Sequence, residues 1–292
     1  MDHHLSHYVW AFVLAAIVAG LLWPSPGLWL RPYLGIILIC LMTLSCLRIG
    51  VREIKIAFLH KDIYLIVALT LATPLLVLLA RPFLAPDVFG GLIIATAVPA
   101  GVSIVFICDM CHGSSAEALS ITTLSHLLSI FTIPVFVRVV LGKVFAISWL
   151  STFLLMLKFI ALPLVIAQFL GPLKRFPRFV WAASTVLLIA IIWAIVAPAR
   201  RYLVMHTMSA VIVFAITIAC IIVLFVIGWV LGRNLKEKIT YSMSASYKNF
   251  TLSNVLAIQL FGEGAALAAI AYAILNSVLF AAIDWFVVRH ER

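Results

Sequence analysis

The sequence predicts an all-α membrane protein with ten transmembrane helices, and three observations lead to this fold class. Of the 292 residues, 65% are apolar and only 10% are charged, whereas a water-soluble domain is roughly 45–50% apolar and about 25% charged. Apolar runs that match the about 20 residues of a membrane-spanning helix recur along the chain. The basic residues behind the formal net charge of +10 lie at the ends of those runs, as they do in membrane proteins.

Short breaks with turn-forming or charged residues separate the expected spans, as at Pro24 to Gly27 and Arg52 to Lys61. No polar stretch between the spans is long enough to fold alone, so we expect a single transmembrane unit over residues 1–292, with no enzyme activity and no cofactor. The spans are expected at residues 8–23, 33–48, 63–80, 88–110, 115–137, 147–170, 179–198, 207–231, 240–261 and 264–287.

The distribution of Lys and Arg orients these spans. An even number of spans places both termini on one side, which carries twelve of the twenty Lys and Arg residues, against six on the other side. Lys158 and Lys248 fall inside spans and complete the count. The excess predicts cytoplasmic termini, in what we expect to be a bacterial inner membrane. The basic residues form no run interleaved with aromatics, so membrane lipid is an expected partner and nucleic acid is not.

The fourth and ninth expected spans carry signals of interruption. In the fourth span, Pro99 lacks a backbone N–H and Gly101 is flexible, so we expect the helix to break there, with a simple proline kink as the alternative. The ninth span is polar from Tyr241 to Asn254, and the apolar run that follows is only about 10 Å long, too short to span a membrane. We therefore expect the polar stretch at membrane depth, facing protein or a wet cavity.

The two halves of the chain resemble each other at an offset of 149 residues. Gly113 to Ile121 is similar to Gly262 to Ile270, and the same offset superposes Lys248 on Pro99. Because each half holds five expected spans, the second half is inverted relative to the first. Inverted repeats with broken helices that meet at mid-membrane are typical of secondary transporters. The expected repeats cover residues 8–137 and 147–287.

Motifs in both halves resemble one known family. They are Pro99-Ala-Gly101-Val-Ser103, Gly113, Leu119 to Ser125, Lys248 to Ile258 and Leu260 to Gly262. On these residues the chain resembles the bile acid:sodium symporter family and its wider superfamily, which includes arsenite-efflux permeases. The resemblance implies a panel and a core domain, with helices 4 and 9 crossing in the core. It also implies a small organic anion that reaches the crossing by alternating access.

The resemblance further implies positions for the family's sodium ligands, and most of them are changed here. The family's Ser-Asn pair falls on Ile104 and Val105, its helix 5 pair on Ala118 and Thr122, and its Glu and Gln on Ser244 and Lys248. Only Thr122 keeps the ligand chemistry, and a lysine ammonium offers no oxygen donor to a cation. We therefore expect that sodium coupling of the family's kind is lost and that protons or exchange replace it.

Lys248 is the most informative single residue. It lies about ten residues into its span, or ~15 Å deep, where an ionisable side chain indicates a functional site; snorkelling to the interface is the alternative. We hypothesise that its ammonium occupies the place of the family's sodium ion and attracts an anionic substrate, helped by half-helix N-termini. If burial favours its neutral form, it instead carries the coupling proton.

Other candidate residues lie near the two breaks or in the fifth span. By resemblance, Asn249 lies beside the substrate cavity, Ser103 is its neighbour at the fourth-span break, and Asn276 lies near another cavity position. In the fifth span, Thr122 and His126 share one helical face. His126 is a candidate proton relay, and the alternative is a histidine hydrogen-bonded to a backbone carbonyl between helices.

The favoured function is a secondary transporter of a small organic anion, and two rival functions stay open. The rival within transport is an arsenite or oxyanion efflux permease. The rival of another class is an intramembrane metal- or haem-binding protein, because Cys108, Cys111 and His112 fit the C-x-x-C-H pattern and thiols bind soft ligands. Lys158, in the sixth span, has no assigned role beyond snorkelling or a structural ion pair.

Overall fold

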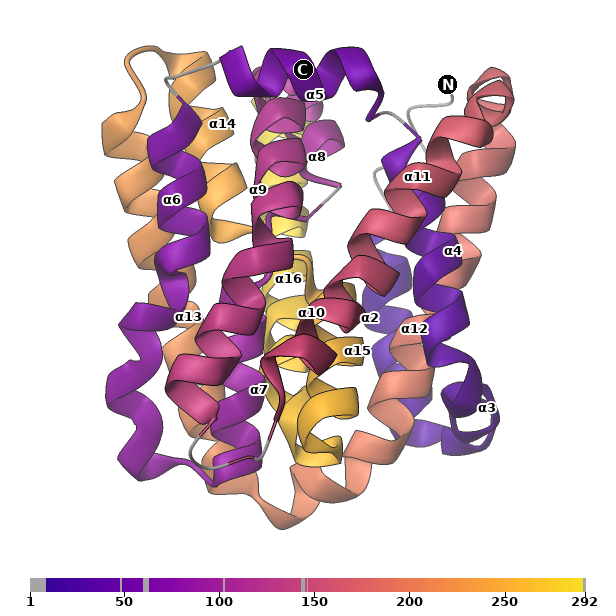
Figure 1. The fold of residues 1–292 in the computed structure, drawn as a ribbon, viewed down its shortest axis with the longest axis vertical. Helices are drawn as coiled ribbons and strands as arrows, with labels where there is room; N and C mark the ends of the chain where they lie inside the picture. The colour runs from indigo at the N-terminus through magenta and orange to yellow at the C-terminus, as the bar shows by residue number, and fades with distance from the viewer. Residues whose placement is uncertain are drawn as a thin grey trace.

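The computed structural model describes residues 9–47, 49–59, 63–101, 103–142, 145 and 147–290. Every regular element in these ranges is a helix (Figure 1). The β-type pairing within them is a single antiparallel bridge between Ala100 and Lys248. The all-helical part of the fold prediction is therefore confirmed.

The helices follow one another with short connections. The first half of the chain forms α2 (Val9–Leu22), α3 (Pro24–Leu30), η1 (Arg31–Tyr33), α4 (Leu34–Cys46), α5 (Val51–Leu59), α6 (Tyr64–Ala72), η3 (Thr73–Phe83), α7 (Pro86–Ala97), α8 (Ile104–Met110), α9 (Ser115–Phe136) and η4 (Val137–Leu141). The second half forms α10 (Trp149–Met156), η5 (Leu157–Ala161), α11 (Leu162–Phe169), η6 (Gly171–Arg175), α12 (Pro177–Met205), α13 (Thr207–Leu231), α14 (Leu235–Ser246), α15 (Phe250–Phe261), η7 (Glu263–Ala265) and α16 (Ala266–His290).

Six helical segments are long and apolar enough to cross a membrane. They are Pro24–Cys46, Tyr64–Phe83, Ser115–Leu141, Trp149–Phe169, Pro177–Leu203 and Thr207–Leu231. Four further apolar helices are shorter: Trp10–Leu22, Pro86–Ala97, Phe250–Phe261 and Glu263–Leu279. Two of these four, α7 and α15, end or begin at a helix break, which divides the apolar length between two elements. The molecule is thus built as a multi-pass membrane protein, and the count of ten spans stays a prediction.

The helices pack into two groups. Helices α2, α3 and α4 pack on α12, η1 joins α3 and α4, and α11 packs on α4; we call these six elements the panel. Helices α6, α7, α8, α9, α13, α14, α15 and α16, with η3 and η7, pack among themselves, and we call this set the core. In Figure 1, α5, α8 and α11 lie at the top of the molecule and α3 lies near the bottom. We refer to these as the α8 end and the α3 end.

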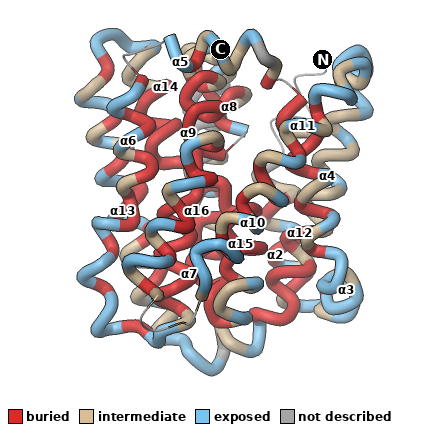
Figure 2. Tube along the Cα trace, viewed as in Figure 1, coloured by how far each residue is buried: buried red, intermediate tan, exposed pale blue. Residues whose placement is uncertain are grey.

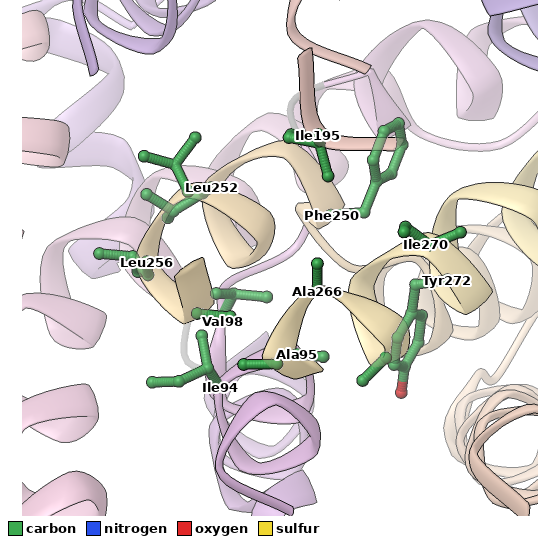
Figure 3. Close-up of a cluster of buried hydrophobic side chains, with 14 of the residues drawn as sticks. Ile94, Ala95, Val98, Ile195, Phe250, Leu252, Leu256, Ala266, Ile270 and Tyr272 are labelled. Carbon is green, nitrogen blue, oxygen red and sulfur yellow. The ribbon is translucent and has the colours of Figure 1, made fainter. Parts of the chain in front are cut away.

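Small side chains bring the core helices close together. In lipid, helix association depends on close van der Waals packing rather than on hydrophobic burial, so small residues favour contact. A Cβ at Gly91 of α7 would lie 2.0 Å from the carbonyl oxygen of Ala265, which shows that backbone packs directly on backbone there. Buried segments run through the centre of the molecule in Figure 2, with exposed residues around them. Figure 3 shows side chains of α7, α12, α15 and α16 converging: Ile94, Ala95, Val98, Ile195, Phe250, Leu252, Leu256, Ala266, Ile270 and Tyr272.

Two helices are interrupted, and the interruptions meet. Helix α7 ends at Ala97 and α8 begins at Ile104, so the break contains Pro99 and Gly101. Helix α14 ends at Ser246 and α15 begins at Phe250, so the second break contains Lys248. The amide of Gly101 donates to the carbonyl of Tyr247 at 3.0 Å, and the amide of Asn249 donates to the carbonyl of Pro99 at 3.0 Å. Each break therefore binds backbone groups that the other leaves free, a requirement away from water.

Candidate functional site

A cavity of about 440 Å³ lies between the panel and the core, and the crossing of the two breaks forms part of its wall. The panel wall includes Leu41, Met42 and Ser45 of α4 and Trp181, Ser184 and Thr185 of α12. The core wall includes Ser103, Val105 and Phe106, near and in α8, together with Tyr247, Asn249 and Thr251. Lys174 of η6 and Pro177 of α12 also line it, which places the cavity toward the α8 end.

The wall of the cavity is mostly apolar, with hydroxyl groups on both sides. Ser184 and Thr185 lie on the panel side, and Ser103 donates to the hydroxyl of Tyr247 at 3.4 Å on the core side. The charged residues that line it are both lysines, Lys174 and Lys248, and no Asp or Glu is among the lining residues. Such a surface suits a guest with an apolar body and a polar or anionic group.

Lys248 borders the cavity, but its amino group is held inside the core. The residue has 0% relative exposure. Its Nζ donates to the backbone carbonyl of Thr70 and, at 3.1 Å, to the hydroxyl of Thr73. Pro74 has no N–H, so the carbonyl of Thr70 lacks its ordinary helical donor four residues on. The amino group therefore lies at a carbonyl that the proline leaves without its helical donor, where α6 gives way to η3. The snorkelling alternative does not describe this side chain.

Asn249 connects the crossing to α9 and to the panel. Its Oδ1 accepts from the amide of Leu252 at 3.2 Å and from the hydroxyl of Thr251 at 2.9 Å, so it caps α15. Its Nδ2 lies 3.4 Å from Nε2 of His126 and 3.6 Å from Sδ of Met42. Because Oδ1 accepts both of these hydrogen bonds, the side-chain amide of Asn249 has one consistent orientation. Its N–H donors point toward His126 and the panel.

His126 is buried and hydrogen-bonded on both ring nitrogens. Nδ1 lies 2.7 Å from the carbonyl of Thr122 in its own helix. A carbonyl only accepts, so Nδ1 carries the proton and Nε2 accepts from Asn249. This arrangement is close to the alternative interpretation of His126 as a histidine hydrogen-bonded to a backbone carbonyl. The carbonyl belongs to the same helix and not to a neighbouring one. The proton-relay role stays a prediction.

Of the remaining candidates of the sequence analysis, Asn276, Ser244 and Thr122 are not among the described residues that line the cavity. Asn276 is buried, and its Nδ2 donates to the carbonyl of Lys248 at 3.5 Å; it is not among the described residues that line the cavity. Ser244 and Thr122 are fully buried, and their hydroxyl oxygens have no hydrogen-bond partner among the described residues. Ser103 does line the cavity.

Sequence reasoning missed the partners of Lys248. Thr70 and Thr73 lie in the third expected span, far from Lys248 along the chain, and nothing in either segment alone reports their contact. The signal that was available is the proline at position 74, because a proline inside an apolar helix leaves a carbonyl that needs a donor. Searching for a buried donor to match it would have pointed to the intramembrane lysine.

Two further features lie outside this site. Lys158 is exposed, in the π-helical turn η5, and its Nζ lies 5.5 Å from the centre of the Phe159 ring. Cys108 and Cys111 are buried cysteines at the end of α8. Within the described residues, no group of three or more His, Cys, Asp or Glu side chains is arranged to hold a metal ion. The structure therefore gives no support to the motif of Cys108, Cys111 and His112 as a metal site.

Comparison with known proteins agrees with the resemblance seen in the motifs. A sequence comparison with curated proteins finds no match. A model of the SBF-like CPA transporter family matches residues 1–289, nearly the whole chain. Two interrupted helices that cross beside a cavity between two helix groups fit the way in which secondary transporters are built. The chain therefore belongs to the SBF-like CPA transporter family, which is of the bile acid:sodium symporter type.

Proposed function

We propose that this transporter moves an amphipathic organic anion by alternating access of the cavity between panel and core. The observation that carries the proposal is the position of the cavity, which lies between two helix groups and includes the crossing of the broken helices in its wall. The proposal includes ten spans in two inverted five-helix repeats. It places both termini in the cytoplasm of a bacterial cell, so that the cavity at the α8 end faces the cytoplasm.

The chemistry of the cavity wall supports the substrate class. Apolar side chains such as Leu41 and Val105 suit a hydrocarbon body, and Trp181 offers a flat apolar face. Lys174 supplies a positive charge at the wall, and the lining residues include no carboxylate to repel an anion. A thiol-dependent arsenite pathway has less support, because neither Cys108 nor Cys111 is among the lining residues.

A bulky side chain at Ser184 is expected to block uptake. Replacing Ser184 by tryptophan adds bulk to the panel wall of the cavity, and overpacking of this kind costs about 1–3 kcal/mol, which corresponds to roughly 5- to 150-fold in affinity. Uptake of a labelled amphipathic anion into proteoliposomes measures the effect. Ser184→Ala is the matched control and is expected to keep the parent's rate; equal uptake by the Trp variant contradicts this cavity as the substrate path.

The proposed transport is not coupled to sodium. The amino group of Lys248 already occupies the crossing, where Thr70 and Thr73 fix it, and in its protonated form it repels a second cation. Ser244 and Thr122 offer neutral hydroxyls and no carboxylate. Protons or exchange of anions are the remaining sources of coupling, with His126 and Lys248 as the candidate proton carriers near the crossing.

Uptake into proteoliposomes under imposed gradients tests this coupling. We expect equal initial rates with inward gradients of sodium, potassium or choline chloride, and a different rate when a pH gradient is imposed. The panel of labelled substrates contains aromatic and aliphatic carboxylates, sulfonates and arsenite. Uptake that requires sodium overturns the coupling proposal, and transport of arsenite alone overturns the substrate class.

A further inference from the structure

Two polar contacts join the panel to the core at the α3 end, opposite the cavity. Nη2 of Arg31, in η1 of the panel, lies 2.7 Å from Oε1 of Glu263, in η7 of the core. The hydroxyl of Tyr202, near the end of α12 in the panel, donates to Oδ1 of Asp87, at the start of α7 in the core, at 3.5 Å. Both contacts cross the same seam between the two groups.

The seam is tightly closed at this end. A Cβ at Gly264 would lie 2.0 Å from Oδ2 of Asp87 and 2.7 Å from the ring of Tyr202. Gly264, the residue next to Glu263, therefore packs against Asp87 of the core and Tyr202 of the panel at once. At the other end, the same seam holds the cavity lined by Lys174 and Ser184.

We propose that the Arg31–Glu263 ion pair is a latch that holds the α3 end of the seam shut while the cavity is reached from the α8 end. This inference rests on the proposed alternating access, because a transporter that opens its α3 end has to separate η1 from η7. The side chains of Arg31 and Glu263 are 44% and 40% exposed, so water solvates each ion as soon as they part. An exposed pair is weak, which suits a contact that breaks in every cycle.

The weakness of the pair sets the size of the expected effect. An exposed ion pair changes the ratio of two conformations by about two- to fivefold, and like charges at the same place change it by a similar factor in the other direction. Salt screens both effects, since the Debye length falls from about 30 Å at 0.01 M to about 10 Å at 0.1 M. The Tyr202–Asp87 contact persists when the ion pair is replaced by like charges or screened by salt. The Arg31–Glu263 latch is therefore one of several contributions to closure.

The test measures access to the cavity rather than transport. A cysteine placed at Ser184, in a Cys40→Ala background, reports the opening of the α8 end when a membrane-impermeant maleimide is added on the Lys174 side of oriented vesicles. Label on the peptide with position 184 is quantified by mass spectrometry. We expect Arg31→Glu, which sets two carboxylates against each other, to slow labelling about two- to fivefold. The double variant Arg31→Glu/Glu263→Arg is expected to restore the rate.

Two controls keep the latch falsifiable. Arg81→Glu makes the same charge change on η3, an element of the core, and is expected to label at the parent's rate. Raising NaCl from 20 to 500 mM is expected to slow labelling of the reporter protein that keeps Arg31 and Glu263. Equal labelling of Arg31→Glu and Arg81→Glu overturns the latch, as does a double variant that stays slow. Because no substrate is needed, a failed uptake assay and a failed latch are distinguishable.

Discussion

Replacing Lys248 by methionine is expected to remove most transport while leaving the fold as stable as before. Methionine nearly fills the space of the lysine stem but cannot donate to Thr70 or Thr73. If the charge of Lys248 draws the anion to the crossing, its loss is expected to lower uptake roughly 10- to 100-fold, which corresponds to about 1.4–2.8 kcal/mol of binding free energy. Initial uptake rates of a labelled anion in proteoliposomes measure this loss.

The stability of the same variant separates a transport role from a structural one. Taking a charge out of water is costly, and replacing a buried ion by an apolar side chain of similar volume is often neutral or stabilising. The carbonyl of Thr70 keeps a partner in the Lys248→Met variant, because the hydroxyl of Thr73 also donates to it at 2.9 Å. We therefore expect an unchanged or raised melting temperature in detergent. Lys158→Met is the matched control, since Lys158 is exposed, and parent-like uptake by Lys248→Met would falsify the role of the ammonium.

Replacing Gly91 by alanine is expected to be among the most destabilising single changes in the molecule. The new Cβ would lie 2.0 Å from the carbonyl oxygen of Ala265 and 2.7 Å from its Cα, and backbone atoms cannot move aside as a flexible side chain does. Helix α7 would have to separate from η7 and α16. Overpacking costs about 1–3 kcal/mol and occasionally more, and we expect the upper end of this range here, about 3 kcal/mol.

The matched control is Gly171→Ala, because a Cβ at Gly171 meets nothing within 4 Å. The free energy of unfolding of this variant is expected to stay close to the parent's. Thermal unfolding of both purified variants, followed by size-exclusion chromatography with fluorescence detection, gives the comparison. A Gly91→Ala variant that melts at the same temperature as the Gly171→Ala variant contradicts the direct backbone packing.

Composition and local chemistry predicted the helical membrane fold and its family, because each depends on residues that are near one another in the chain. Pro99, Gly101 and the polar stretch around Lys248 mark the two breaks for the same reason. Contacts between distant segments were beyond such reasoning: Lys248 with Thr70, Asn249 with His126, and Arg31 with Glu263 depend on how helices are placed against each other. Resemblance put Asn276 near the cavity, and in the structure it contacts the carbonyl of Lys248, a residue that borders the cavity.

The mutual hydrogen bonds of the two breaks also bear on how the protein is made. The free carbonyl of Pro99 and amide of Gly101 are satisfied by a segment synthesised roughly 150 residues later, which takes roughly 7–30 s at about 5–20 residues per second. During that interval the first half has unpaired polar backbone that lipid does not tolerate. A nascent first half therefore has to wait at the insertion machinery or beside water, and a fragment ending near residue 142 is expected to be degraded by membrane proteases unless the second half is co-expressed.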